Sequence, residues 1–194
     1  FTRSARRLTK INIMQYLKDY KPTIDSVPRA RILLIGAVGA GKSSFFNSIN
    51  SIFRGNITSQ ANAGYQETSL TLQVMLHCKK KSGYSIHFIF KVTRKTFLLL
   101  FLDVPVMALL TKVDKVCPHV EKDLKNVYYK LHVSLQIKKA SGCLGIAESN
   151  VLPVKNYSSE TELNDTSDIL LLSAMKQMLN FSDNYIDNFD KDTH

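Results

Sequence analysis

Eight consecutive residues near the start of the chain have the types and the spacing that phosphate binding requires. The stretch Gly36-Ala37-Val38-Gly39-Ala40-Gly41-Lys42-Ser43 fits the pattern G-x-x-x-x-G-K-[ST]. Its glycines let the main chain bend closely around an anion, so that successive N–H groups point toward it. The stretch therefore predicts a loop that binds a nucleoside triphosphate.

Each part of this loop has an expected role. Lys42 and the main-chain N–H groups would hold the phosphates, and the Ser43 hydroxyl would bind Mg²⁺. If the γ-phosphate is transferred, Lys42 is the catalytic residue that stabilises the charge developing on it. The predicted phosphate-binding residues are Gly36, Val38, Gly39, Ala40, Gly41, Lys42, Ser43 and Ser44.

The flanking residues predict the strand and the helix that must position the loop. Residues 32–35 form a continuous apolar run, which is typical of a buried parallel strand. Phe45, Ile49 and Ile52 then follow at helical spacing, and the positive N-terminal end of that helix would face the phosphates. This order of strand, loop and helix favours a nucleotide site over a glycine turn without a ligand.

A second motif predicts which base is bound. Thr111-Lys112-Val113-Asp114 follows the apolar run 106–110, at the strand end where open α/β sheets bind ligands. The Asp114 carboxylate can accept two hydrogen bonds from the ring N–H and the amino group of guanine, and adenine lacks this donor pair. The stem of Lys112 can pack on the face of the base. The motif favours GTP or GDP over ATP, and an ATP-binding P-loop enzyme is the alternative.

The loop after the next predicted strand, residues 151–154, should close over the base. Either Lys155 or Asn156 is positioned to approach the base, and Tyr157 could pack beside it. The S-A-K sequence that is familiar at this point in guanine-nucleotide-binding proteins is absent. The assignment therefore depends on chain order alone.

The alternation of strands and helices predicts an α/β fold, a P-loop NTPase of the Ras-like GTPase class. We expect a three-layer sandwich with a mainly parallel sheet and one antiparallel hairpin strand, the hairpin formed by residues 70–76 and 86–92. Residues 1–28 would form an N-terminal helix and a linker, and residues 29–194 the nucleotide-binding domain. A last helix should begin near residue 166 or 167.

A helix is also predicted to begin at Pro118 and to bury one continuous apolar stripe. The stripe consists of Val120, Leu124, Val127, Tyr128, Leu131 and Leu135.

The formal net charge of +10 and the clustering of basic residues raise the question of an anionic partner. The clusters could contact nucleic acid or an anionic membrane surface. No aromatic platform accompanies them, which favours solvated charge on exposed faces. The clusters are Arg3, Arg6, Arg7 and Lys10; residues 79–81; and residues 138–139.

Cysteine usage and hydropathy predict a cytoplasmic location. The three cysteines are widely spaced and form neither a zinc pattern nor a disulfide framework, so reduced thiols are expected. No secretory signal opens the chain, and the longest apolar run, residues 97–102, is too short to span a bilayer.

Taken together, several stretches resemble the interferon-induced protein 44 and 44-like family. They are residues 20–26, 31–36, 39–48, 51–55, 109–118 and 151–160. The resemblance implies a cytosolic guanine-nucleotide-binding domain in a vertebrate protein of interferon-driven antiviral defence. It also implies that full-length members carry a further N-terminal domain.

One element of a working GTPase is missing. An Asp-x-x-Gly turn should follow the third strand, between about residues 90 and 105, where its Asp holds Mg²⁺ through water. No such turn follows Val92, and Asp103 lacks the glycine. Residues 93–105 are also too few for the helix, strand and second helix expected there, since each parallel crossover takes about a dozen residues. We hypothesise that a segment is absent between about residues 90 and 97.

This gap leaves the hydrolytic activity open. Thr68 is the candidate for the threonine that closes over Mg²⁺, and Ser69 and Thr58 are weaker candidates. No residue can be assigned to orient the attacking water. The sequence therefore predicts either a slow GTPase or a nucleotide-gated switch, with a non-hydrolysing scaffold that works through a protein partner or self-association as the alternative.

Overall fold

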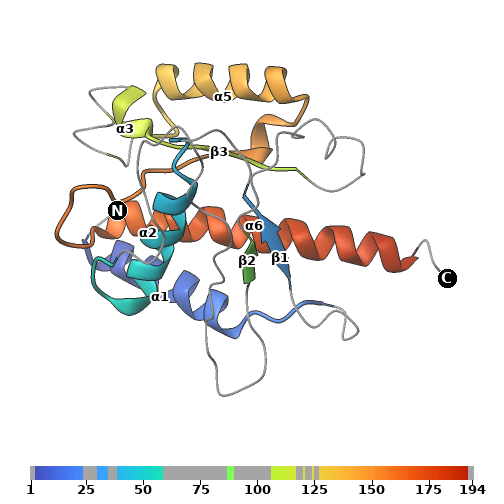
Figure 1. The fold of residues 1–194 in the computed structure, drawn as a ribbon, viewed down its shortest axis with the longest axis horizontal. Helices are drawn as coiled ribbons and strands as arrows, with labels where there is room; N and C mark the ends of the chain where they lie inside the picture. Colours follow the sequence, from blue (N-terminus) through green and yellow to red (C-terminus); the bar gives the residue numbers. More distant parts are fainter. Residues whose placement is uncertain are drawn as a thin grey trace.

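The computed structural model describes residues 3–23, 30–34, 39–58, 87–89, 106–116, 120, 124 and 127–191. Figure 1 shows these elements. In chain order they are α1 (Arg3–Asp19), β1 (Arg31–Leu33), α2 (Lys42–Arg54), β2 (His87–Ile89), β3 (Ala108–Leu110), α3 (Val113–Val116), α5 (Leu131–Leu144), the 3₁₀ turn η3 (Glu148–Asn150), β4 (Val151–Pro153) and α6 (Asp165–Lys191).

The described strands form two parallel pairs. β1 pairs with β2, with Arg31 opposite His87, and β3 pairs with β4, with Ala108 opposite Val151. The chain is therefore a mixed helix–sheet protein with short parallel strands. Half of the predicted antiparallel hairpin, residues 70–76, lies outside the described residues.

The β3–β4 pair lies between two helices, as Figure 1 shows, with α5 on one side and α6 on the other. Parallel pairing brings the carboxyl ends of both strands to one edge of the pair. The Val154 N–H donates to the Leu110 carbonyl at 2.9 Å, which extends the pairing by one residue. The segment that begins at Thr111 and the segment that begins at Lys155 therefore start next to each other.

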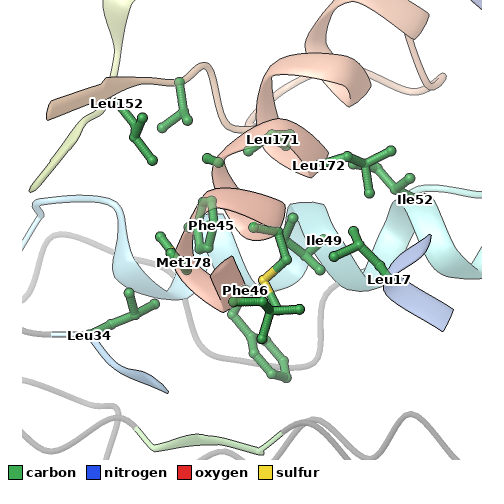
Figure 2. Close-up of a cluster of buried hydrophobic side chains, with 14 of the residues drawn as sticks. Leu17, Leu34, Phe45, Phe46, Ile49, Ile52, Leu152, Leu171, Leu172 and Met178 are labelled. Carbon is green, nitrogen blue, oxygen red and sulfur yellow. The ribbon is translucent and has the colours of Figure 1, made fainter. Parts of the chain in front are cut away.

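The main core joins α2, α6 and α1 (Figure 2). The α2 face contributes side chains that are almost fully buried, which are Phe45, Phe46, Ile49 and Ile52. Leu171, Leu172 and Met178 of α6 and Leu17 of α1 pack against them. Full burial of one such side chain stabilises the fold by about 1.5–3 kcal/mol. This packing fixes the helix that follows the glycine-rich stretch.

The helix ends agree with the chemistry of the sequence. Gly55 takes a left-handed conformation with φ 81° and donates to carbonyls of the last turn of α2, which stops that helix. Asn164 caps α6, because its Oδ1 accepts from the Thr166 N–H at 2.9 Å. The predicted start of α6 is thus confirmed to within two residues. None of the described helices is both long and apolar enough to cross a membrane.

The apolar stripe predicted after Pro118 is buried as far as Val127 and is wrong beyond it. Val120 and Val127 are almost fully buried, and Leu124 packs against them. Residues 127–129 form a turn and α5 begins only at Leu131, so the spacing before the turn does not continue after it. Val133 faces the core, whereas Leu131 and Leu135 are 69% and 51% exposed and Tyr128 is exposed as well. A turn of a few residues is enough to change the phase of the apolar positions.

Candidate functional site

The described part of the predicted phosphate loop, residues 39–41, is here called the glycine loop. Gly39 and Gly41 have φ angles of 78° and 89°, which side chains with a Cβ atom rarely adopt. Gly41 precedes the first residue of α2, and its carbonyl accepts the Phe45 N–H at 2.8 Å. Gly36 and Val38 lie outside the described residues, and their roles stay predictions.

Side chains from the ends of β3 and β4 hold the glycine loop by its carbonyls. The hydrogen bonds are Lys112 Nζ to Gly39 O at 3.2 Å, Thr111 Oγ1 to Ala40 O at 3.0 Å and Asn156 Nδ2 to Gly41 O at 3.0 Å. The C=O and N–H of one planar peptide unit point in opposite directions. The N–H groups that share these peptides, those of residues 40–42, therefore point away from the three side chains.

The contact at Gly41 is close enough to require a glycine. A Cβ atom at this position would lie 2.9 Å from Asn156 Nδ2 and 3.5 Å from Thr111 Cγ2. The other amide atom of Asn156, Oδ1, is buried and has no hydrogen-bond partner within the described part of the chain. A buried acceptor that receives no hydrogen bond destabilises the fold. Asn156 thus lies close to the backbone of Gly41 and also offers a buried acceptor, Oδ1, that a donor group of a ligand could fill.

The T-K-x-D residues follow β3 directly. Lys112 has a φ of 58°, the only positive value among the described residues other than glycine. This conformation is uncommon for a residue with a side chain and costs of order 1 kcal/mol. Asp114 lies in the first turn of α3 and is half-buried. The structure brings Thr111 and Lys112 to the glycine loop, and the contact of Asp114 with a base stays a prediction.

Lys42, Ser43 and Ser44 form the first turn of α2. Burial lowers the pKa of the Lys42 ammonium, because desolvation disfavours its charged form. An anion bound beside this ammonium would compensate that cost. The N-terminal N–H groups of a helix have no partner within their own helix, which suits the same anion.

The metal candidates divide into two groups. The weaker candidate Thr58 lies beside the end of α2, where its hydroxyl accepts from Asn50 at 2.9 Å and its N–H donates to Ser51 Oγ at 2.8 Å, and its role at Mg²⁺ stays a prediction. Ser51 is eight residues beyond Ser43, which is ~12 Å along the helix. Thr68 and Ser69 lie outside the described residues. Nowhere in the described ranges do three or more His, Cys, Asp or Glu side chains gather as a metal site.

The loop between β4 and α6, residues 154–164, separates the two candidates for contact with the base. Asn156 contacts the glycine loop, whereas Lys155 Nζ pairs with Glu160 Oε1 at 2.7 Å. The expectation that Tyr157 packs beside the base is wrong, because its ring is buried in the main core and its hydroxyl donates to Asp168 at 2.7 Å. Within this loop Asn156 is thus the residue that the structure places at the glycine loop.

Comparison with known proteins identifies relatives that match about nine tenths of this chain. Curated homologues of this chain are named interferon-induced protein 44 and interferon-induced protein 44-like. The human 44-like protein is 28% identical, the human 44 protein 26% and the mouse 44 protein 25%, each over 89–91% of this chain. The chain spans only 56–60% of the length of these relatives. No family model matches it, and no solved structure matches at a significant level.

The relatives named interferon-induced protein 44 and 44-like are longer than this chain inside the matched region. The match to the human 44-like protein extends over 251 residues, whereas 89% of the 194 residues here is about 173. About 78 aligned positions therefore have no counterpart in this chain. The hypothesis that a segment is absent from this chain stays a prediction. The expected location of that segment, between residues 90 and 97, lies outside the described residues.

Sequence reasoning missed the residues that hold the β4–α6 loop in place. The Tyr157 N–H donates to Ser48 Oγ of α2 at 2.8 Å, and Asp168 pairs with Lys10 of α1. Lys10 was expected to carry solvated charge, yet its side chain is only 18% exposed. No local sequence pattern predicts these contacts, because each joins residues more than a hundred positions apart.

Proposed function

We propose that this chain is a guanine-nucleotide-binding domain of P-loop fold that binds GTP and GDP with Mg²⁺. The observation that carries the proposal is the set of hydrogen bonds from Thr111, Lys112 and Asn156 to the carbonyls of the glycine loop. These bonds join the predicted phosphate site to the predicted base site. A single nucleotide needs both sites on one edge of the sheet.

The phosphates would be held by groups whose geometry suits an anion. The N–H groups of residues 40–42 point away from the side chains that hold the loop, and Lys42 stands at the start of α2. The Ser43 hydroxyl would bind Mg²⁺, which neutralises phosphate charge when bound. The residues present fit this group, because Ser43 is the first hydroxyl after the lysine and α2 begins at the glycine loop.

The guanine would be read by the T-K-x-D residues. Asp114 would accept two hydrogen bonds from the base, and the Lys112 stem would lie against the ring. Lys112 is held near the glycine loop by its bond to the Gly39 carbonyl, which limits where its stem can lie. ATP would leave the Asp114 carboxylate without donors, which is the physical basis of the preference for guanine.

Hydrolysis, where it occurs, would follow in-line attack of water on the γ-phosphate, with Lys42 stabilising the charge. The threonine candidate Thr68 lies outside the described residues, and no residue is assigned to orient the water. We therefore propose a slow GTPase or a nucleotide-gated switch. A scaffold that binds nucleotide without hydrolysis is the second candidate, favoured by the shorter matched region relative to the curated homologues.

Calorimetric titration of the protein with GDP, GTP and ATP in the presence of Mg²⁺ tests the proposal. We expect GDP and GTP to bind at least tenfold more tightly than ATP, and Lys42→Ala to lose most of the affinity. In Asp114→Asn the amide offers a donor, so the preference should move toward a xanthine nucleotide, which has a carbonyl in place of the amino group. Equal binding of ATP and GTP would overturn the role of Asp114, and absent binding at millimolar nucleotide would overturn the proposal.

Phosphate release by the wild type and by Lys42→Ala separates the two candidates. A slow release that Lys42→Ala abolishes supports the GTPase. Equal background rates in both proteins, with GDP binding retained by the wild type, support the scaffold. The two proteins serve as each other's control, because they differ at one side chain of the phosphate site.

The names of the curated relatives support a biological setting. We propose that this protein is itself induced by interferon and acts in antiviral defence in the cytoplasm, since the human and mouse relatives are named interferon-induced proteins. Measuring its transcript before and after interferon treatment of cells from its source organism tests the first part. Unchanged transcript would contradict it.

A further inference from the structure

The N-terminal helix α1 runs parallel to α6, and polar contacts join α6 to α1 and to the residues that follow α1. Figure 1 shows the two helices side by side. The contacts advance in the same direction on both sides, from Lys10 at Asp165 and Asp168 and Tyr16 at Asn180 to Tyr20 at Asp183 and Thr23 at Asp187, with Tyr20 and Thr23 lying just beyond the end of α1. Only the first of these contacts lies at the end of α6 that follows the β4–α6 loop.

This first contact is a buried ion pair. Lys10 Nζ lies 2.5 Å from Asp168 Oδ2, and the Asp168 side chain is 0% exposed. Burial alone would lower the pKa of Lys10, but its bonds to Asp168 and Asp165 outweigh this effect and raise the pKa. The ammonium therefore stays charged near neutral pH. A carboxylate buried in this way needs such a partner, because an unpaired buried charge is strongly destabilising.

The same carboxylate holds Tyr157. The Tyr157 hydroxyl donates to Asp168 Oδ1 at 2.7 Å and accepts the Asn164 N–H at 2.6 Å. Burial, followed by the bond to Asp168, raises the pKa of Tyr157, so the hydroxyl stays protonated and remains a donor. One hydroxyl thus joins Tyr157, near the start of the β4–α6 loop, to Asn164 at its end.

Tyr157 in turn lies next to the site. Its N–H donates to Ser48 Oγ at 2.8 Å, and that oxygen donates to the Ser44 carbonyl in the first turn of α2 at 2.7 Å. The preceding residue, Asn156, holds the Gly41 carbonyl. The position of Tyr157 therefore sets the position of a side chain that contacts the glycine loop.

We propose that Lys10 is a positioning residue of the nucleotide site, acting through Asp168 and Tyr157 on Asn156. The proposal rests on the proposed function and adds a regulation to it. Docking of α1 orders the β4–α6 loop and slows the loss of a guanine nucleotide, and by linkage a bound nucleotide strengthens the docking of α1. Whatever moves the N-terminal helix thereby changes how long the nucleotide is kept.

The first test needs no nucleotide. Hydrogen exchange at the Tyr157 amide is measured in the wild type, in Lys10→Met and in Tyr20→Phe. Tyr20→Phe is the matched control, since it removes a bond from the residue after α1 to Asp183 of α6, away from the loop. We expect exchange to be about tenfold faster in Lys10→Met, a typical size for coupling between sites, to stay unchanged in Tyr20→Phe and to be restored in Lys10→Arg. Equal exchange in Lys10→Met and the wild type would overturn the proposal.

The second test measures the dissociation rate of a fluorescent GDP analogue. We expect Lys10→Met and Tyr157→Phe each to release it about five- to tenfold faster, the double variant to be no faster than either, and Tyr20→Phe to match the wild type. Tyr157→Phe keeps both charges and so serves if Lys10→Met does not fold. Equal release by all variants, or an equal effect of Tyr20→Phe, would overturn the proposal. If the wild type binds no GDP, the proposed function fails and the regulation with it, while the exchange test still decides whether Lys10 orders the loop.

Discussion

The glycine loop and the β4–α6 loop meet at Asn156, yet they are held in different ways. The glycine loop is held by its main-chain carbonyls, which accept from Thr111, Lys112 and Asn156. The β4–α6 loop is held mainly by contacts between side chains, from Tyr157 to Asp168 and from Asp168 to Lys10 of the distant helix α1. In the first arrangement the acceptors are groups that every residue has, whereas in the second both partners are side chains.

This difference has consequences for stability and for function. Removing one of three bonds to carbonyls weakens the glycine loop by a single interaction, worth about 1 kcal/mol. Removing one member of the buried network leaves a charge or a polar atom without its partner, which costs more than the bond itself. The glycine loop should therefore tolerate changes in its partners better than the β4–α6 loop does.

The largest effect is expected from the charge in the buried network. Lys10→Met leaves Asp168 buried without its cation and should lower the free energy of unfolding by ~3 kcal/mol. Tyr20→Phe, which removes a neutral donor to α6 just beyond the end of α1, should cost about 1 kcal/mol. Urea denaturation at pH 7 measures both. Equal losses would mean that the charge of the network adds nothing to its other contacts.

The next largest effect is expected at the backbone of the glycine loop. Gly41→Ala forces a side chain into a left-handed conformation and places its Cβ 2.9 Å from Asn156 Nδ2, so we expect a loss of ~2 kcal/mol. Gly55→Ala is the matched control, because its φ is 81° but nothing lies within 4 Å of the added Cβ. This control should lose only ~1 kcal/mol by thermal denaturation. A loss at Gly55 as large as that at Gly41 would show that the contact with Asn156 is unimportant.

The same contrast explains which parts could be predicted from the sequence. The glycine loop, the start of α2 and the strand before Thr111 depend on local chemistry, such as glycines that permit positive φ and apolar residues at fixed spacing. Chain order alone predicts that Lys155 or Asn156 approaches the base, and the structure places Asn156 at the glycine loop. Chain order could not separate Asn156 from Lys155, because the choice depends on the ion pair with Glu160.

The rest could not be predicted, because distant residues decide it. Lys10 and Asp168 are each typical of an exposed helix face, and only the packing of α1 on α6 brings them together. Tyr157 follows the predicted base contacts directly, yet its hydroxyl finds a carboxylate in the core. The buried face of α5 could not be predicted either, because the turn at residues 127–129 has no glycine or proline to mark it.

A smaller effect is expected from one donor to the glycine loop. Thr111→Val keeps the shape of the side chain and removes the hydroxyl that donates to the Ala40 carbonyl at 3.0 Å. The loss should be ~1 kcal/mol in stability and about fivefold in GDP affinity. Thr9→Val, which removes a hydroxyl bonded to the Ala5 carbonyl inside α1, is the control and should leave GDP affinity unchanged. If Thr111→Val binds GDP as tightly as the wild type, this hydroxyl does not contribute to the nucleotide site.

The smallest effect tests the exposed end of the β4–α6 loop through its pH dependence. Burial alone would raise the pKa of Glu160, but the bonds from Lys155 and from the Ser158 N–H lower the pKa to about 2, below its usual 4.5. The carboxylate therefore stabilises the fold above pH 4.5, and this contribution is lost as the pH falls from 4.5 toward 2. Because the pair is partly exposed, Glu160→Gln should cost only about 0.5–1 kcal/mol at pH 7 and almost nothing near pH 2, as measured by urea denaturation across that range. Glu162→Gln changes an exposed neighbour and is the control, so its cost in stability should not change between pH 7 and pH 2. If the cost of Glu160→Gln persists at pH 2, packing of the side chain rather than its charge stabilises this part of the loop.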